Sequence, residues 1–202
     1  MFNGIASEAE RRSFLNGIQG DGSYRLNAFN TLRAGFSVSA EQTRASSISS
    51  VLPDDTTNPP IDSLSDETSK LGWLLGVYAQ DEIRLTSQLT LNVGLRFDQM
   101  YEYVDANQWS PRVSLEYRPF EGTTLHAGYA RYFTPPPQVA AGPTNISLFD
   151  NTVAASSCPE GGCGLVQPER SHYFDAGITQ KIFPGLEVGV DAYYKLAHDL
   201  PR

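Results

Sequence analysis

The fold is decided by residues 89–98, which read LTLNVGLRFD. Every second position in this stretch is apolar, and the positions between are polar or glycine. The apolar set is Leu89, Leu91, Val93, Leu95 and Phe97. A two-residue period is the repeat of a β-strand, whose successive side chains point to opposite faces of a sheet. Residues 89–98 therefore predict a strand with one apolar and one polar face.

The same alternation recurs on both sides of this stretch. It predicts strands near residues 31–41, 71–85, 89–103, 109–118, 123–133, 169–182 and 186–196. Several exceed the roughly five to six residues of an average strand and reach the about 9–11 residues that a tilted strand needs to span a membrane. We therefore expect seven strands, or eight if residues 1–26 supply another.

The predicted connections differ in length. Residues 86–88, 119–122 and 183–185 form short turns, the last containing Pro184-Gly185. The intervening segments 44–70 and 134–168 are long and rich in Ser, Thr and Pro, and only 104–108 is short. Short turns at one end and longer loops at the other are typical of outer-membrane barrels.

Composition agrees with strands that cross a membrane. The mean hydropathy is −0.32, and no stretch approaches the roughly 20 apolar residues of a membrane-spanning helix. In a barrel only alternate residues face lipid, so a polar average is expected. The polar positions form a charged set that would line the lumen of a barrel or face water in a sandwich: Arg33, Glu82, Arg84, Arg96, Asp98, Arg112, Glu116, Arg118, Glu187, Asp191 and Lys195. Aromatic residues gather near strand ends, as in an interfacial girdle: Tyr101, Tyr103, Trp109, Tyr117, Phe120, Tyr132, Phe133, Phe183 and Tyr194.

Charge and motifs argue against several classes of function. The net charge is −8 and basic residues are scattered singly, which argues against nucleic-acid binding. The chain has no G-x-S-x-G, no H-E-x-x-H and no phosphate loop, so we predict neither an enzyme nor a bound cofactor. Cys158 and Cys163 lie in one predicted loop without a nearby His. A loop disulfide is the favoured interpretation over a free or metal-binding pair.

Four stretches, in order, resemble motifs of TonB-dependent receptors: residues 77–98, 109–115 (WSPRVSL), 127–136 (AGYARYFTPP) and 168–177. The resemblance implies an antiparallel up-and-down transmembrane β-barrel in the outer membrane, surrounded by lipid, plugged by an N-terminal domain and driven through TonB. No signal peptide, plug or closing aromatic strand is evident in residues 1–202. We therefore expect the chain to be about seven to eight strands of a larger barrel, with TonB contacted by N-terminal parts outside it.

The function implied by this resemblance is uptake of a scarce large solute, most often a ferric siderophore, with oligosaccharides or cobalamin as other ligands. Loops on a rigid wall carry recognition, so the long loops are the expected site. The candidate ligand contacts are Tyr132, Phe133, Gln138 and Asn145. Two alternatives remain open: a small structural or adhesive membrane barrel, and a soluble β-sandwich binding module.

Overall fold

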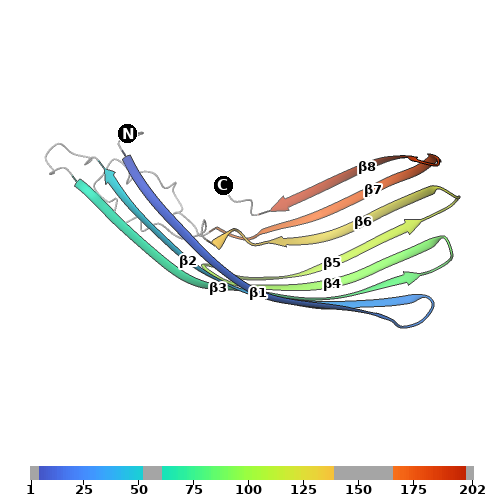
Figure 1. Ribbon diagram of the computed structural model, residues 1–202, viewed down its shortest axis with the longest axis horizontal. Coiled ribbons are helices and arrows are strands. Elements are labelled where there is room, and N and C mark those ends of the chain that lie inside the picture. Colours follow the sequence, from blue (N-terminus) through green and yellow to red (C-terminus); the bar gives the residue numbers. More distant parts are fainter. Residues whose placement is uncertain (1–4, 52–60, 139–165, 199–202) are drawn as a thin grey trace.

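The chain folds into a single curved sheet of eight strands (Figure 1). The computed structural model describes residues 5–51, 61–138 and 166–198. The strands are β1 (Ile5–Arg25), β2 (Asn30–Val51), β3 (Ile61–Arg84), β4 (Leu89–Tyr101), β5 (Asp105–Tyr117), β6 (Thr123–Thr134), β7 (Glu169–Phe183) and β8 (Leu186–His198). Within these ranges, no helix is long and apolar enough to cross a membrane.

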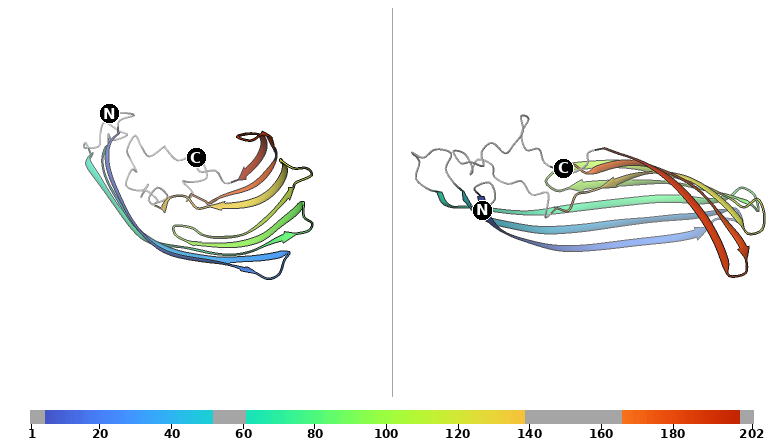
Figure 2. Two further views of the ribbon diagram at one scale, coloured as in Figure 1. Left: turned by 45° about the vertical axis from the view of Figure 1, so that its right-hand side comes forward. Right: turned by 90° about the horizontal axis from the view of Figure 1, so that it is seen from above.

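The sheet is an open half-barrel. Each strand pairs antiparallel with its neighbour in the chain, in the order β1 to β8, and the sheet curls around a concave face (Figure 2). This confirms the all-β, up-and-down topology. A sandwich needs two sheets and a closed small barrel needs β1 paired with β8; the described strands form neither arrangement.

The register keeps the polar and apolar faces separate across neighbouring strands. Tyr78, Arg96 and Ser110 lie opposite one another on β3, β4 and β5, and so do Val77, Phe97 and Trp109 on the other face. A slip of one residue would exchange the faces of a strand. Most of the large exposed apolar side chains therefore form one outer surface, which is the surface that a membrane barrel presents to lipid.

The first three strands are much longer than the others. They contain 21, 22 and 24 residues, against 12 to 15 in β4 to β8, and they project at the end where β1 begins (Figure 1). The prediction that 44–70 is a loop is therefore wrong, because residues 44–51 and 61–70 belong to β2 and β3. The pattern hid them because Ser, Thr and charged residues occupy both faces of these extensions.

The remaining connections are close to their predicted positions. The turn containing Pro184 has Gly185 at φ 96°, a backbone conformation that favours glycine. The connection expected at 104–108 is shorter and lies at 102–104. The sequence predicted β1 only as a possible eighth strand, and the structure contains it. In the turn after β1, Asn27 Oδ1 accepts hydrogen bonds from the backbone N–H groups of Phe29 and Asn30 at 2.7 and 2.8 Å.

A charge on the outer face tests the assignment of the two faces. Leu95 lies in the middle of β4 with 46% of its surface exposed. We expect Leu95→Arg to destabilise the membrane-inserted protein by about 2–4 kcal/mol, the cost of Arg near the bilayer midplane. Urea unfolding in lipid vesicles measures this change. The matched control is Asn92→Arg on the inner face of β4, which we expect to change stability little; equal losses in both variants would contradict the assignment.

Candidate functional site

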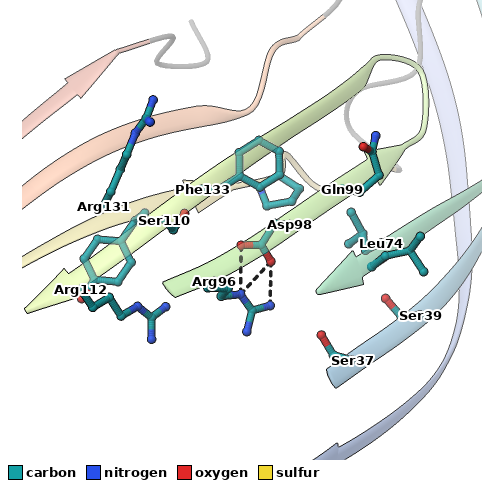
Figure 3. Close-up of a pocket in the computed structure, with 13 residues that line it drawn as sticks. Ser37, Ser39, Leu74, Arg96, Asp98, Gln99, Ser110, Arg112, Arg131 and Phe133 are labelled. Carbon is teal, nitrogen blue, oxygen red and sulfur yellow. Dashed lines mark hydrogen bonds and ion pairs between the residues drawn. The ribbon is translucent and has the colours of Figure 1, made fainter. Parts of the chain in front are cut away.

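A cavity of about 340 Å³ lies on the concave face and is the candidate site (Figure 3). It is lined from five strands and the segment after β6: Ser37, Ser39, Leu74, Leu75, Arg96, Asp98, Gln99, Ser110, Arg112, Arg131, Tyr132, Phe133 and Pro135. Most of these residues come from the polar set of the two-residue alternation, because that set faces the inside of the curve. The strand period therefore places the polar part of the lining, whereas Leu75, Gln99, Arg131 and Phe133 come from the opposite set of the alternation.

An arginine–aspartate pair forms the floor of the cavity. Arg96 Nε donates to Asp98 Oδ1 and Oδ2 at 2.7 and 3.0 Å, and the two residues are neighbours on the inner face of β4 (Figure 3). Gly76 on β3 makes room for the guanidinium, because a Cβ there would collide with Arg96 Nη2 and lie 2.8 Å from Ser37 Oγ. The pair therefore lies against the inner face of the sheet, and the Asp98 carboxylate offsets the positive charge of Arg96.

A second arginine stands over an aromatic ring beside this pair. The Arg112 guanidinium carbon lies 5.7 Å from the ring centroid of Tyr132, within the range of a cation–π interaction. In the part of the chain that the structure describes, Arg112 has no carboxylate within ion-pair distance. Both residues also line an adjoining cavity of about 210 Å³. Arg112 is therefore a cation available to a ligand from either cavity.

Aromatic rings continue from Tyr132 across the inner face. Tyr132 and Tyr173 have ring centroids 6.0 Å apart, and Tyr173 stacks on Tyr193 at 5.8 Å. These three tyrosines come from β6, β7 and β8, and all belong to the inner-facing set. They form an apolar track with polar tips next to the cavity, edge-on between Tyr132 and Tyr173 and stacked between Tyr173 and Tyr193.

The cavity adjoins an opening in the ladder between β5 and β6. Backbone pairing there runs only from Tyr117 and Leu125 to Arg112 and Ala130, and it ends beside Pro111, which has no N–H to donate. Beyond this point, side chains donate hydrogen bonds to backbone carbonyl groups. Arg131 Nη1 donates to Trp109 O (3.5 Å), Arg170 Nη2 to Asn107 O (3.4 Å) and Gln108 Nε2 to Tyr132 O (2.9 Å).

The predicted ligand contacts fall in three different places. Tyr132 and Phe133 both line the cavity. Gln138 is completely buried, and its Nε2 donates to Thr43 Oγ1 (3.2 Å) and Lys70 O (2.9 Å), so it fastens the segment after β6 onto β2 and β3. Asn145 lies outside the described residues, as do Cys158 and Cys163, and their roles stay predictions.

Gln138 and the buried carboxylate side chain of Glu102 both lie over Gly72. Glu102 follows β4 in the 102–104 connection and is only 5% exposed. Burial, reinforced by the negative charge of Glu41, raises the pKa of the Glu102 carboxyl to about 7. Glu102 Oε2 and Gln138 Oε1 are both buried without a hydrogen-bond partner among the described residues.

The sequence predicted which residues face the inside of the sheet, but it did not predict this cavity. Arg96, Asp98 and Arg112 were predicted to face the lumen, yet nothing in the alternation distinguishes them from other inner charges such as Arg33. Their special feature is the register, which places Arg96 opposite Ser110 and Arg112 opposite Gly94 and Ala130. Pro111, inside a predicted strand, was the one local signal that the ladder opens here.

Comparison with known proteins identifies the family to which this chain belongs. The family model described as "TonB dependent receptor-like, beta-barrel" matches residues 3–200, so the chain belongs to that family. No curated protein sequence matches it. The family and its structural relatives are receptors and transporters rather than enzymes.

Three solved structures illustrate the structural similarity. The copper transporter OprC shares 17% identity over 97% of this chain, with a TM-score of 0.66. The outer-membrane ferripyoverdine receptor of Pseudomonas aeruginosa shares 15% over 96%, with a TM-score of 0.61. The alcaligin receptor FauA of Bordetella pertussis shares 14% over 96%, with a TM-score of 0.52. The matches cover 31%, 27% and 30% of those chains, so this chain spans about a third of their length or less.

Filling the space over Gly76 tests the architecture of the cavity floor. We expect Gly76→Val to push Arg96 off β3, break its bonds to Asp98 and lower the free energy of unfolding by about 1–3 kcal/mol, the usual cost of overpacking. Denaturant unfolding in detergent measures the loss. Gly22→Val is the matched control, because a Cβ at Gly22 meets nothing within 4 Å. A variant at Gly76 as stable as the control would show that Arg96 does not need this space.

Proposed function

We propose that this chain forms part of the barrel wall of an outer-membrane receptor that takes up a scarce large solute, most often a ferric siderophore. The proposal rests on the family, on the apolar outer face and on a polar concave face that carries a cavity. Transport through such a barrel also requires a plug and contact with TonB, which we assign to parts of the protein outside these residues.

The charge of the cavity is the observation that favours an anionic solute. Among the described residues, its lining includes three arginines, Arg96, Arg112 and Arg131, and a single carboxylate, Asp98. The whole chain, in contrast, carries a net charge of −8. A local excess of positive charge in a concave, partly water-excluded site attracts anions. Siderophores whose catecholate or carboxylate groups bring more than three negative charges to Fe³⁺ give anionic complexes, and these fit this site better than neutral oligosaccharides do.

Two aromatic residues add contact area to the proposed site. Tyr132 lies under the Arg112 guanidinium and begins the tyrosine track, and Phe133 lines the same cavity. We propose that both contact the solute directly. Gln138 contributes by fixing the segment after β6, and Asn145 remains a proposed contact in the loop that follows. Cys158 and Cys163 are proposed to form a disulfide in that loop.

Removal of the cavity groups tests the proposal. We expect Arg112→Ala and Tyr132→Ala each to weaken solute binding about tenfold or more, because each removes a contact of at least roughly 1.4 kcal/mol. Binding is measured by titrating ferric siderophores of differing charge onto the protein purified from outer membranes. Growth under iron limitation then reports uptake.

The matched control is Tyr194→Ala, which removes a tyrosine from the lipid-facing side of β8 and should leave binding unchanged. Tight binding of a neutral oligosaccharide with no siderophore binding would contradict the proposed solute class. Equal effects of Tyr132→Ala and Tyr194→Ala would contradict the proposed site.

A further inference from the structure

A cluster of oxygen atoms, separate from the arginine-lined cavity, surrounds Gly72 on β3. Glu41 on β2 is directly opposite Gly72 in the register. A Cβ at Gly72 would collide with Gln138 Oε1 and would lie 2.7 Å from Glu102 Cγ. Gly72 is therefore the floor on which a carboxylate side chain and an amide oxygen meet, with a second carboxylate on the neighbouring strand.

The orientation of the Gln138 amide is fixed by its hydrogen bonds. Its nitrogen donates to Thr43 Oγ1 and to Lys70 O, so Oε1 must point the other way, toward Gly72 and Glu102. The Gln138 side chain is completely buried and this oxygen has no partner among the described residues. A buried oxygen without a donor is costly. The amide therefore offers a free acceptor aimed into the cluster.

Among the residues that the structure describes, no positive side chain forms an ion pair with either glutamate, Glu41 or Glu102. Lys70, the nearest inward-facing cation on β3, has its Nζ 6.0 Å from the ring centroid of Tyr103 instead. Glu41 Oε1 accepts a hydrogen bond from Ser13 Oγ at 2.5 Å. Glu102 is buried and Glu41 is partly exposed, and two neighbouring carboxylates without a counter-charge repel each other.

We propose that Glu41, Glu102 and the Gln138 side-chain oxygen bind a divalent cation of the calcium class. Ca²⁺ takes carboxylate and amide oxygens in flexible geometry and completes its coordination with water. Its charge matches the two glutamates, and it satisfies the free oxygens of Glu102 and Gln138 together. The described residues hold no group of three or more His, Cys, Asp or Glu arranged for a metal, so the amide is an essential third ligand.

The position of the cluster also suits calcium. It lies where β3 extends past the end of β4, since Trp73 pairs with Tyr101 and Glu102 begins the 102–104 connection. Long extensions belong to the external side of outer-membrane barrels. Calcium modules outside cells commonly bind with dissociation constants of about 10⁻⁴–10⁻³ M. A bound ion would join β2, the 102–104 connection and residue 138, whatever solute the receptor carries.

Calcium titration of the protein purified from outer membranes in detergent tests this proposal. After treatment with a chelator, we expect calorimetry to detect Ca²⁺ binding with a dissociation constant of about 10⁻⁴–10⁻³ M, and terbium luminescence to report the same site. Glu102→Gln and Glu41→Gln should each weaken binding at least about tenfold, equivalent to roughly 1.4 kcal/mol. Both replacements are close to isosteric, and heat-modifiable gel mobility confirms that each variant folds.

Glu116→Gln is the matched control. Glu116 faces the same interior but pairs with Arg118 at the opposite end of the sheet, so its replacement should leave calcium affinity unchanged. Absence of calcium binding, or equal affinity in the wild type and Glu102→Gln, would overturn the proposal. A wild type that binds no calcium and loses stability as the pH rises toward 7, with Glu102→Gln abolishing that loss, would show that a proton on Glu102 occupies the cluster instead.

Discussion

The whole structure depends on pairing the backbone N–H and C=O groups. Lipid offers no hydrogen bonds, so a strand that crosses it must find all of its partners in neighbouring strands. The unbroken antiparallel order from β1 to β8 meets this requirement, and it fixes the register that separates a polar concave face from an apolar outer face. The outer edges of β1 and β8 have the same requirement, which further strands of a receptor barrel would meet.

The candidate site lies where this pairing is interrupted. The ladder between β5 and β6 stops next to Pro111, and Arg131, Arg170 and Gln108 donate to the backbone carbonyls left over. Arg131 therefore has a structural role as well as a place in the cavity lining. The opening also lies beside Tyr132 and Phe133, so an interruption of the sheet adjoins the cavity that we propose as the solute site.

Polar groups on the inner face differ in whether their charges and hydrogen-bonding atoms have partners. Arg96 and Asp98 neutralise each other within one strand, which leaves Arg112 as the cation open to a ligand. Glu102 Oε2 and Gln138 Oε1, in contrast, have no hydrogen-bond partner in the described residues. The first arrangement accounts for an anion-attracting cavity and the second for the proposed calcium site. Both lie on the same concave face. In both, side chains lie directly over a glycine of β3, which leaves them room.

The sequence by itself determined the strand period, the two faces, most turns and the receptor family, because each is recorded within a few consecutive residues. It missed the ends of β2 and β3, since Ser- and Thr-rich strands outside lipid show no apolar alternation. It also could not reveal the cavity or the contacts of Gln138. The cavity depends on strand register, and Gln138 is placed by hydrogen bonds to Thr43 and Lys70 from a distant part of the chain, so only the tertiary structure decides these contacts.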